Sequence, residues 1–184
     1  MNKVYFTSDL HLGHRNIIQY DNRPFKTIED HDHFIITSWN NTVDHKDTIY
    51  FLGDFSLGFK NAGIHYDETI LQNLNGHKFF IKGNHDHRDT VKLFEKYGTY
   101  LGELKKIKVF DQEIVLCHYA MLVWNKSHHG SWHLHGHSHH SLPIDNHSLR
   151  LDVGVNGWNY SPVPFEQVKE ELSKRIFKPI DHHK

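Results

Sequence analysis

Residues 79–86 read Phe-Phe-Ile-Lys-Gly-Asn-His-Asp, a short apolar run that leads directly into four residues rich in polar side chains. A run of this length, bounded by Gly and Asn, is typical of a buried strand that ends in a turn. In open α/β sheets, ligands bind outside the carboxyl ends of the strands. The stretch therefore predicts a strand with a polar site at its end.

Four further segments have the same form, with short apolar runs at 4–6, 49–52, 114–116 and 132–134. Their polar ends are Asp9-Leu10-His11, Gly53-Asp54, His118 and Gly136-His137-Ser138-His139. Each end taken alone resembles an ordinary turn. Five strand ends that each carry Asp, Asn or His, in one chain, instead predict a single metal centre.

Ligand chemistry narrows this prediction. Side chains alternate along an extended chain, so Asp9 and His11 are expected on one face, and His137 and His139 repeat that spacing. Carboxylate and imidazole ligands suit Mn²⁺, Fe or Zn²⁺, and the chain has no thiolate cluster of the kind that holds a structural zinc ion. The two oxygens of Asp54 could bridge two metal ions.

Length, net charge, cysteine count and apolar runs limit the class of protein that this chain can be. With 184 residues we expect one domain over residues 1–178 and a polar tail over 179–184. The formal net charge of −1 indicates no broad basic surface for nucleic acid or membrane. Cys117 is the single cysteine, which excludes an internal disulfide. No run approaches the roughly 18 apolar residues of a membrane span, and we expect a soluble, cytosolic protein.

The elements alternate in a way that favours a layered α/β fold. Thr27 is expected to cap a helix whose apolar face includes Ile35 and Trp39. Further helices are predicted over residues 67–74, 89–97 and 165–177, and a hairpin over 104–110 and 113–117.

Histidine is unusually frequent, with 20 residues. We interpret most of them as polar surface, namely His31, His33, His45, His65, His77, His87 and His147. His128 and His129 are expected in a solvent-exposed loop. For His133 and His135, strand packing or a hydrogen bond behind the site is expected.

In sequence order, the five polar ends read Asp-x-His, Gly-Asp, Gly-Asn-His-Asp, His and Gly-His-x-His. This order resembles the calcineurin-like metallophosphoesterase superfamily. Within it, the block Ser8–His14 and the stretch Val153–Asn156 look like a compact bacterial and phage group. The resemblance implies a β-sandwich flanked by helices, an α/β (α+β layered) fold with a dimetal site at the carboxyl ends of the strands.

The resemblance also implies residue roles. One metal ion would be held by Asp9, His11, Asp54 and His139, and the other by Asp54, Asn84, His118 and His137. His85 would contact the phosphate or protonate the leaving group, and Asp86 would orient His85. His14 and Arg23 are expected to line the pocket and bind a phosphate or a ribose. For Arg23 the alternative is a surface ion pair or a contact at a helix entry.

The function implied is hydrolysis of phosphoester bonds by a metal-bridging hydroxide. We favour a phosphodiesterase, because the chain is too short for an obvious cap and because Gly83-Asn84-His85-Asp86 looks like the phosphodiesterases of the superfamily. A small-molecule phosphomonoesterase and a metal-binding scaffold are the alternatives. Two divalent ions are expected, Mn²⁺ first and Fe or Zn²⁺ next, with a phosphorylated small molecule or nucleotide as substrate.

Overall fold

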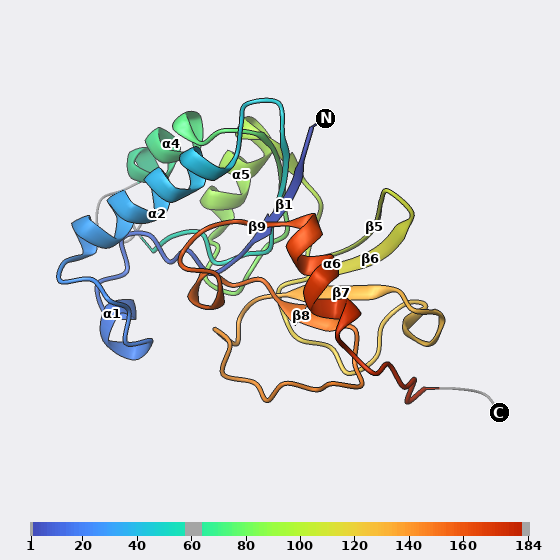
Figure 1. The fold of residues 1–184 in the computed structure, drawn as a ribbon. Helices are drawn as coiled ribbons and strands as arrows, with labels where there is room; N and C mark the ends of the chain where they lie inside the picture. The colour runs from blue at the N-terminus through green and yellow to red at the C-terminus, as the bar shows by residue number, and fades with distance from the viewer. Residues whose placement is uncertain (1, 58–63, 182–184) are drawn as a thin grey trace.

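The computed structural model describes residues 2–57 and 64–181, which form two β-sheets with helices around them (Figure 1). The first sheet has the order β4-β3-β2-β1-β9 and the second the order β5-β6-β7-β8. The strands of the first sheet are β1 (Val4–Thr7), β2 (Thr48–Phe51), β3 (His77–Phe80), β4 (Thr99–Tyr100) and β9 (Val163–Pro164). Those of the second are β5 (Leu104–Val109), β6 (Gln112–Cys117), β7 (Trp132–His135) and β8 (Arg150–Asp152).

The strands that carry the site are parallel to one another within each sheet. β1, β2, β3 and β4 pair in parallel, and only β9 runs antiparallel beside β1. In the second sheet β6, β7 and β8 are parallel, and β5 forms the predicted antiparallel hairpin with β6. Parallel strands end at the same edge, so each sheet presents its polar strand ends together.

Helices cover both sheets. They are α1 (Ile17–Tyr20), α2 (Ile28–Thr42), α4 (Ile64–Asn73), α5 (Arg88–Tyr97) and α6 (Phe165–Ser173), with 3₁₀ turns at Ser127–His129 and Val155–Gly157. Figure 1 shows α2, α4 and α5 gathered on one side of β1. α6 packs against β1, β8 and β9. The predicted cap is confirmed, because Thr27 Oγ1 accepts a hydrogen bond from the Asp30 N–H at 3.1 Å.

The last helix is shorter than predicted. It ends at Ser173 rather than at residue 177. Beyond it, the N–H groups of Ile176 and Lys178 donate to the carbonyls of Asn146 and His147 instead of continuing the helix. The expected tail begins at residue 179, yet Asp181 accepts hydrogen bonds from Ser127 Oγ at 3.0 and 3.1 Å. His182 and His183 lie outside the described residues.

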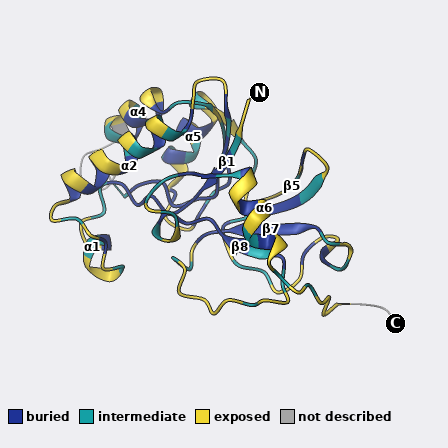
Figure 2. Cartoon of the chain, viewed as in Figure 1, coloured by how far each residue is buried: buried dark blue, intermediate teal, exposed yellow. Residues whose placement is uncertain are grey.

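Two apolar cores lie on opposite faces of the first sheet. Tyr5 and Phe6 are adjacent on β1, and alternation places them in different cores. Phe6 belongs to the core that includes Leu134 of β7 and Val168 of α6. Tyr5 belongs to the core that includes Trp39 of α2. The central strands β1 and β2, with both faces covered (Figure 2), consist largely of apolar residues.

The carboxyl ends of the two sheets meet. The His118 side chain, after β6, donates from Nδ1 to the carbonyl of Leu52, after β2, at 2.7 Å. Ser8, after β1, forms an isolated parallel bridge with Gly154, after β8. These two connections bring the polar strand ends of both sheets to one place. Among residues 2–57 and 64–181, every helix is too short or too polar to cross a membrane.

Candidate metal centre

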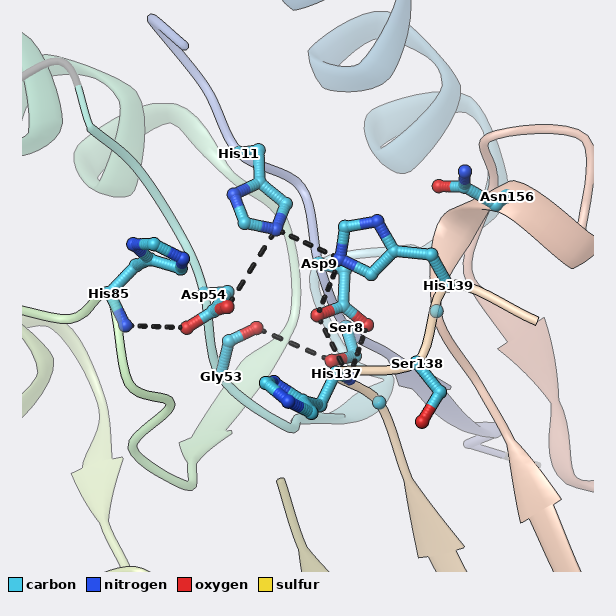
Figure 3. A network of polar contacts seen from close by, with 12 residues as sticks. Ser8, Asp9, His11, Gly53, Asp54, His85, His137, Ser138, His139 and Asn156 are labelled. Atoms are coloured by element: carbon cyan, nitrogen blue, oxygen red, sulfur yellow. Dashed lines mark hydrogen bonds and ion pairs between the residues drawn. The ribbon is translucent and has the colours of Figure 1, made fainter. Parts of the chain in front are cut away.

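Six of the seven predicted ligands form two compact groups between the strand ends. The groups are Asp9, His11 and His139, and Asp54, His118 and His137. Within each group, one ligand atom from each residue lies within 4.8 Å of the others. Figure 3 shows Asp9, His11 and His139 beside Asp54, with His137 below them. The arrangement offers two adjacent candidate cation sites.

Asp54 lies between the two groups. Its Oδ2 atom is 3.3 Å from His118 Nε2 and 3.7 Å from His11 Nε2. One carboxylate oxygen therefore faces a histidine of each group, which is the position of a bridging ligand. The seventh predicted ligand, Asn84, places Oδ1 3.1 Å from His118 Nε2 and so joins the second group.

The imidazole rings of His118 and His139 are oriented by hydrogen bonds from Nδ1, the nitrogen that points away from the site. His118 donates from Nδ1 to the carbonyl of Leu52 at 2.7 Å, and His139 donates from Nδ1 to Asp21 Oδ2 at 2.5 Å. With Nδ1 held in a hydrogen bond, each ring would present its Nε2 lone pair to a metal ion that displaces the proton from Nε2. Both rings are thus oriented as candidate metal ligands.

The donor set fits divalent cations. Around His118 Nε2 lie Asp54 Oδ2 and Asn84 Oδ1, and around His139 Nε2 lie His11 Nε2 at 3.1 Å and Asp9 Oδ1 at 3.6 Å. These are lone pairs converging on two points, which a cation at each point would satisfy. Oxygen and imidazole ligands without a thiolate suit Mn²⁺, Fe or Zn²⁺.

Five of the ligands adopt a left-handed backbone, contrary to the extended segments expected from the Asp-x-His and His-x-His spacing. The φ angles are 59° at Asp9, 53° at His11, 62° at Asp54, 66° at His137 and 46° at His139. Non-glycine residues in this region carry strain of order 1–3 kcal/mol each. The turns are held by backbone hydrogen bonds, from the Asp9 N–H to the Gly53 carbonyl at 3.0 Å and from the His11 N–H to the Asp54 carbonyl at 3.1 Å.

Two glycines allow the ligand loops to approach each other. Gly53 has a φ of +94°, and a Cβ there would lie 2.5 Å from the backbone nitrogen of Gly83. A Cβ at Gly136 would lie 2.4 Å from Asp9 Oδ2. The Gly that precedes Asp54 and the Gly that precedes His137 are therefore required by close contact within the site.

Charged partners shift the pKa values of the ligands. Burial lowers the pKa of His139, but its contacts with Asp21 and Asp9 outweigh burial and raise that pKa to about 9. Burial also acts to raise the pKa of Asp54, but His118 and the His85 N–H hold it below its usual range. The Asp54 carboxylate thus stays ionised and favours a cation beside it.

The Asp86 carboxylate contacts backbone groups of the neighbouring loops, and its predicted role of orienting His85 stays a prediction. The Asp86 carboxylate is buried and accepts hydrogen bonds from three backbone N–H groups: those of Gly83 at 2.8 Å, Asp54 at 2.9 Å and Phe55 at 2.9 Å. Burial is the main cause that raises its pKa to about 6. Asp86 therefore fastens the loop after β3 to the loop after β2 and positions Asp54.

Arg23 also lies elsewhere than expected. Its side chain has no exposed area, and its Nη groups donate to the carbonyls of Asp9 at 2.9 Å and Leu10 at 3.0 Å. It further contacts the Asp21 carboxylate at 3.1 Å. Arg23 is therefore buried and holds the ligand loop after β1 through these hydrogen bonds. It does not line the pocket.

His31 is not a surface residue, which corrects the interpretation of its context. It is fully buried, accepts a hydrogen bond from Arg23 Nη1 at 2.8 Å and donates to Asp32 Oδ1 at 2.6 Å. Asp32 Oδ2 accepts hydrogen bonds from the Gly13 N–H at 2.8 Å and from the Tyr66 hydroxyl. This chain of bonds connects the ligand loop to α2 and α4.

His85 and His14 lie at the open side of the site. His85 is exposed, its N–H donates to Asp54 Oδ1 at 2.8 Å, and its ring lies 5.4 Å from that of His11 (Figure 3). The half-buried ring of His14 lies 5.6 Å from that of His11. Burial and the neighbouring His85 lower the pKa of His14. Both imidazoles can reach a ligand at the metal centre.

Sequence reasoning missed Asp21, whose Oδ2 accepts from His139 and also from Asn156 Nδ2 at 3.1 Å. An Asp followed by Asn looks like an ordinary turn, so no local signal marks it. Beside it lies an open cavity of about 530 Å³, whose lining includes Tyr20, Asn22, His137, Ser138, His139, Ser141 and Asn156. The cavity adjoins ligands of both groups.

The fold and site define a mixed α/β protein with two sheets, helices around them and two adjacent candidate metal-ligand groups. No protein-family model matches the chain. It is 35% identical over 180 residues to the uncharacterized protein MJ1445 of Methanocaldococcus jannaschii, with 95% of this chain and 93% of that protein covered. The chain therefore belongs to the same family as this archaeal protein.

Other similarities extend over most of the chain. The Gene 66 protein of Mycobacterium phage L5 is 29% identical, with 86% of this chain and 88% of that protein covered. A protein of unknown function from Aquifex aeolicus, AQ665, has a solved structure that matches with a TM-score of 0.70, 22% identity, and 93% of this chain and 100% of that chain covered. This likeness shows the fold.

Two solved phosphoesterases match less well. YfcE from E. coli has a TM-score of 0.48 and 17% identity, with 83% of this chain and 78% of that chain covered. An archaeal phosphodiesterase has a TM-score of 0.48 and 15% identity, with 85% and 86% covered. Similarity at this level carries no argument about function, so the function is argued from the site.

Proposed function

We propose that the protein is a dinuclear-metal-dependent phosphoesterase, with phosphodiesters as its favoured substrates. The observation that supports this most is the position of Asp54, whose Oδ2 atom faces His11 of one ligand group and His118 of the other. A single carboxylate shared between two groups is the arrangement expected for two metal ions held close together.

The bound ions would supply positive charge for the phosphoryl oxygens and would lower the pKa of a water molecule. The chain positions this chemistry. Asp21 and the Leu52 carbonyl orient His139 and His118. Asn84 contributes an uncharged oxygen, so the centre stays more positive than it would with another carboxylate, which favours a phosphate anion.

His85 is the residue we assign to catalysis. It is exposed at the open side of the centre, and its N–H bond to Asp54 Oδ1 fixes its backbone beside the bridging carboxylate. From there the imidazole would donate a hydrogen bond to a phosphoryl oxygen or a proton to the leaving group. The exposed position of His85 argues against a role in packing.

The open cavity beside His137 and His139 supports the preference for diesters. Apart from these two histidines and Asp21, its lining consists of uncharged side chains, from Tyr20, Asn22, Ser138, Ser141 and Asn156. Such a lining accepts a neutral polar group better than a second phosphate. A phosphodiester carries a second alcohol group that needs this space, whereas a monoester of a small alcohol does not.

The test compares hydrolysis of bis-p-nitrophenyl phosphate and p-nitrophenyl phosphate by the Mn²⁺-loaded protein. We expect a diester-to-monoester ratio well above one, and loss of activity after chelation. A ratio well below one would assign a phosphomonoesterase. No turnover of either ester by protein that binds two metal ions would favour the scaffold alternative.

His85→Ala tests the catalytic assignment in the same assay. We expect it to retain both metal ions and to lose a factor on the order of 10²–10⁴ in rate. His45→Ala is the matched control, because His45 is an exposed histidine that precedes the amino end of β2, away from the carboxyl ends. Full activity of His85→Ala would remove the assigned role.

A further inference from the structure

A second cavity lies behind the metal-ligand loop, between β8, the segment after α6 and the loop that joins β7 to β8. Its volume is about 280 Å³, and its lining includes His140, Asp145, Arg150, Asp152 and Arg175. In Figure 1 this loop is the orange segment below β8. The residues that line it differ from those that line the cavity beside the metal centre.

The two arginines lack a carboxylate partner among residues 2–57 and 64–181. Arg150 Nη1 donates to the Met121 carbonyl at 3.4 Å, and Arg175 Nη1 donates to the Asp145 carbonyl at 2.6 Å. Both side chains are half-buried. A guanidinium has five N–H donors in a planar fork, so each arginine retains donors that could bind an anion in the cavity.

The aspartates on the cavity wall contact groups other than the arginines, and Asp152 Oδ1 lies 3.6 Å from His140 Nε2. Asp152 accepts from the Gly154 N–H at 2.8 Å and from the His140 N–H at 3.0 Å. Asp145 accepts from the His147 N–H at 2.9 Å. These carboxylates shape the loop and do not neutralise the arginines directly. Their charges nevertheless oppose a highly charged ligand, so a monoanion fits better than a dianion such as phosphate.

The remaining wall is apolar apart from His135. Leu142, Pro143, Ile144 and Leu151 line the cavity, and Ile144 is 77% exposed on the loop. A ligand with a short hydrocarbon body would cover this surface, and its charged end would face the arginines. The volume limits the ligand to a small molecule.

We propose that this cavity binds a small aliphatic carboxylate, with the carboxylate held by Arg150 and Arg175 and the hydrocarbon body against Leu142 and Ile144. The site is separate from the proposed catalytic centre and does not depend on the function proposed there. The ligand would hold the loop of residues 140–145 against β8 and would thereby stabilise the folded protein.

The test measures butyrate binding by isothermal titration calorimetry and by thermal unfolding, with chloride at equal ionic strength as the reference. We expect butyrate to bind and to raise the melting temperature. Arg150→Gln and Arg175→Gln should each weaken binding by at least about tenfold, the change expected from the loss of a charge-assisted bond. Arg88→Gln, at an exposed arginine of α5, is the matched control.

Two further arms separate this site from the metal centre and from other anions. Asp54→Asn should bind butyrate as the unaltered protein does, because that residue lies in the other site. Absence of butyrate binding, binding that survives in both arginine variants, loss of binding in Asp54→Asn, or tighter binding of inorganic phosphate than of butyrate at the arginines would each overturn the proposal. Arg150→Lys keeps the charge but loses the fork, so it should bind butyrate more weakly than the unaltered protein and more tightly than Arg150→Gln.

Discussion

The Nδ1 atom of His139 lies 2.5 Å from the Asp21 carboxylate, which also accepts hydrogen bonds from Arg23 and Asn156. Asp21 therefore connects a candidate metal-ligand imidazole after β7 to Arg23, which holds the ligand loop after β1. A carboxylate behind a metal-binding histidine fixes the ring and increases its basicity. The metal affinity of the candidate site that contains His139 is thus expected to depend on Asp21, a residue outside the ligand set.

Replacement of Asp21 tests this dependence. We expect Asp21→Asn to weaken binding at the site of His139 by about 10–100-fold, because the amide is a poorer acceptor for the His139 N–H. Competition between the protein and a chromophoric chelator measures the affinity. Asp30→Asn, at an exposed position on α2, is the control. Equal Mn²⁺ affinity at both sites in Asp21→Asn would show that the contact has no such role.

We expect Asp86 to support the site by stabilising the loops around Asp54. Asp86→Asn places an NH₂ group against at least one of the N–H donors of Gly83, Asp54 and Phe55. We expect the free energy of unfolding to fall by about 1–3 kcal/mol, the usual cost of a buried group left unpaired, with a loss of metal from the displaced Asp54. Urea denaturation measures the first effect and elemental analysis the second. Unchanged stability with a large fall in rate would instead support the role expected from sequence.

Replacement of Arg23 distinguishes a structural role, in which it holds the ligand loop after β1, from a contact with the substrate. Arg23→Lys removes bonds to the carbonyls of Asp9 and Leu10, and we expect a loss of about 3 kcal/mol of stability because a buried charged network is broken. At saturating Mn²⁺, KM should change little. Arg15→Lys, which alters an exposed pair with Glu29, should change neither quantity. A raised KM with intact stability would restore the substrate contact.

Stability should depend on pH through His133. This residue is fully buried, and burial lowers its pKa from 6.5 to about 4. Between these values the unfolded chain binds a proton that the folded chain does not, so the free energy of unfolding falls as pH falls. The loss from this group between pH 6.5 and 4 is about 3 kcal/mol.

Urea denaturation of chelated protein at several pH values measures this dependence. His133→Gln keeps a donor and an acceptor but cannot titrate, so its stability should vary less over the same range. His33→Gln, at an exposed histidine, should behave as the unaltered protein does. The same pH dependence in His133→Gln and in the unaltered protein would mean that other groups cause it.

The polar strand ends could be predicted because each is a local pattern. Asp9, Asp54 and His118 each follow, within three residues, an apolar run that does form a parallel strand, and the topology brings parallel ends together. The helix from Ile28 was likewise predictable from the Thr27 cap and the apolar face. In both cases residues close in sequence determine the feature.

The supporting network was not predictable, because its members are distant in sequence and individually ordinary. Nothing near His31 indicates that it will be buried against Arg23, and nothing near Asp21 indicates His139 as its partner. The left-handed backbone at Asp9 and His137 also departs from the strand geometry that their spacing suggests. Such strain is set by tertiary contacts rather than by local propensity.

The number of metal ions bound per chain tests the central claim most directly. Metal-depleted protein is titrated with Mn²⁺ by calorimetry, and the bound metal is then counted by elemental analysis. The account predicts two ions per chain, and fewer than two in Asp54→Asn, since that carboxylate faces both ligand groups. One ion or none in the unaltered protein, or two ions in Asp54→Asn with undiminished affinity, would contradict a dinuclear centre bridged by Asp54.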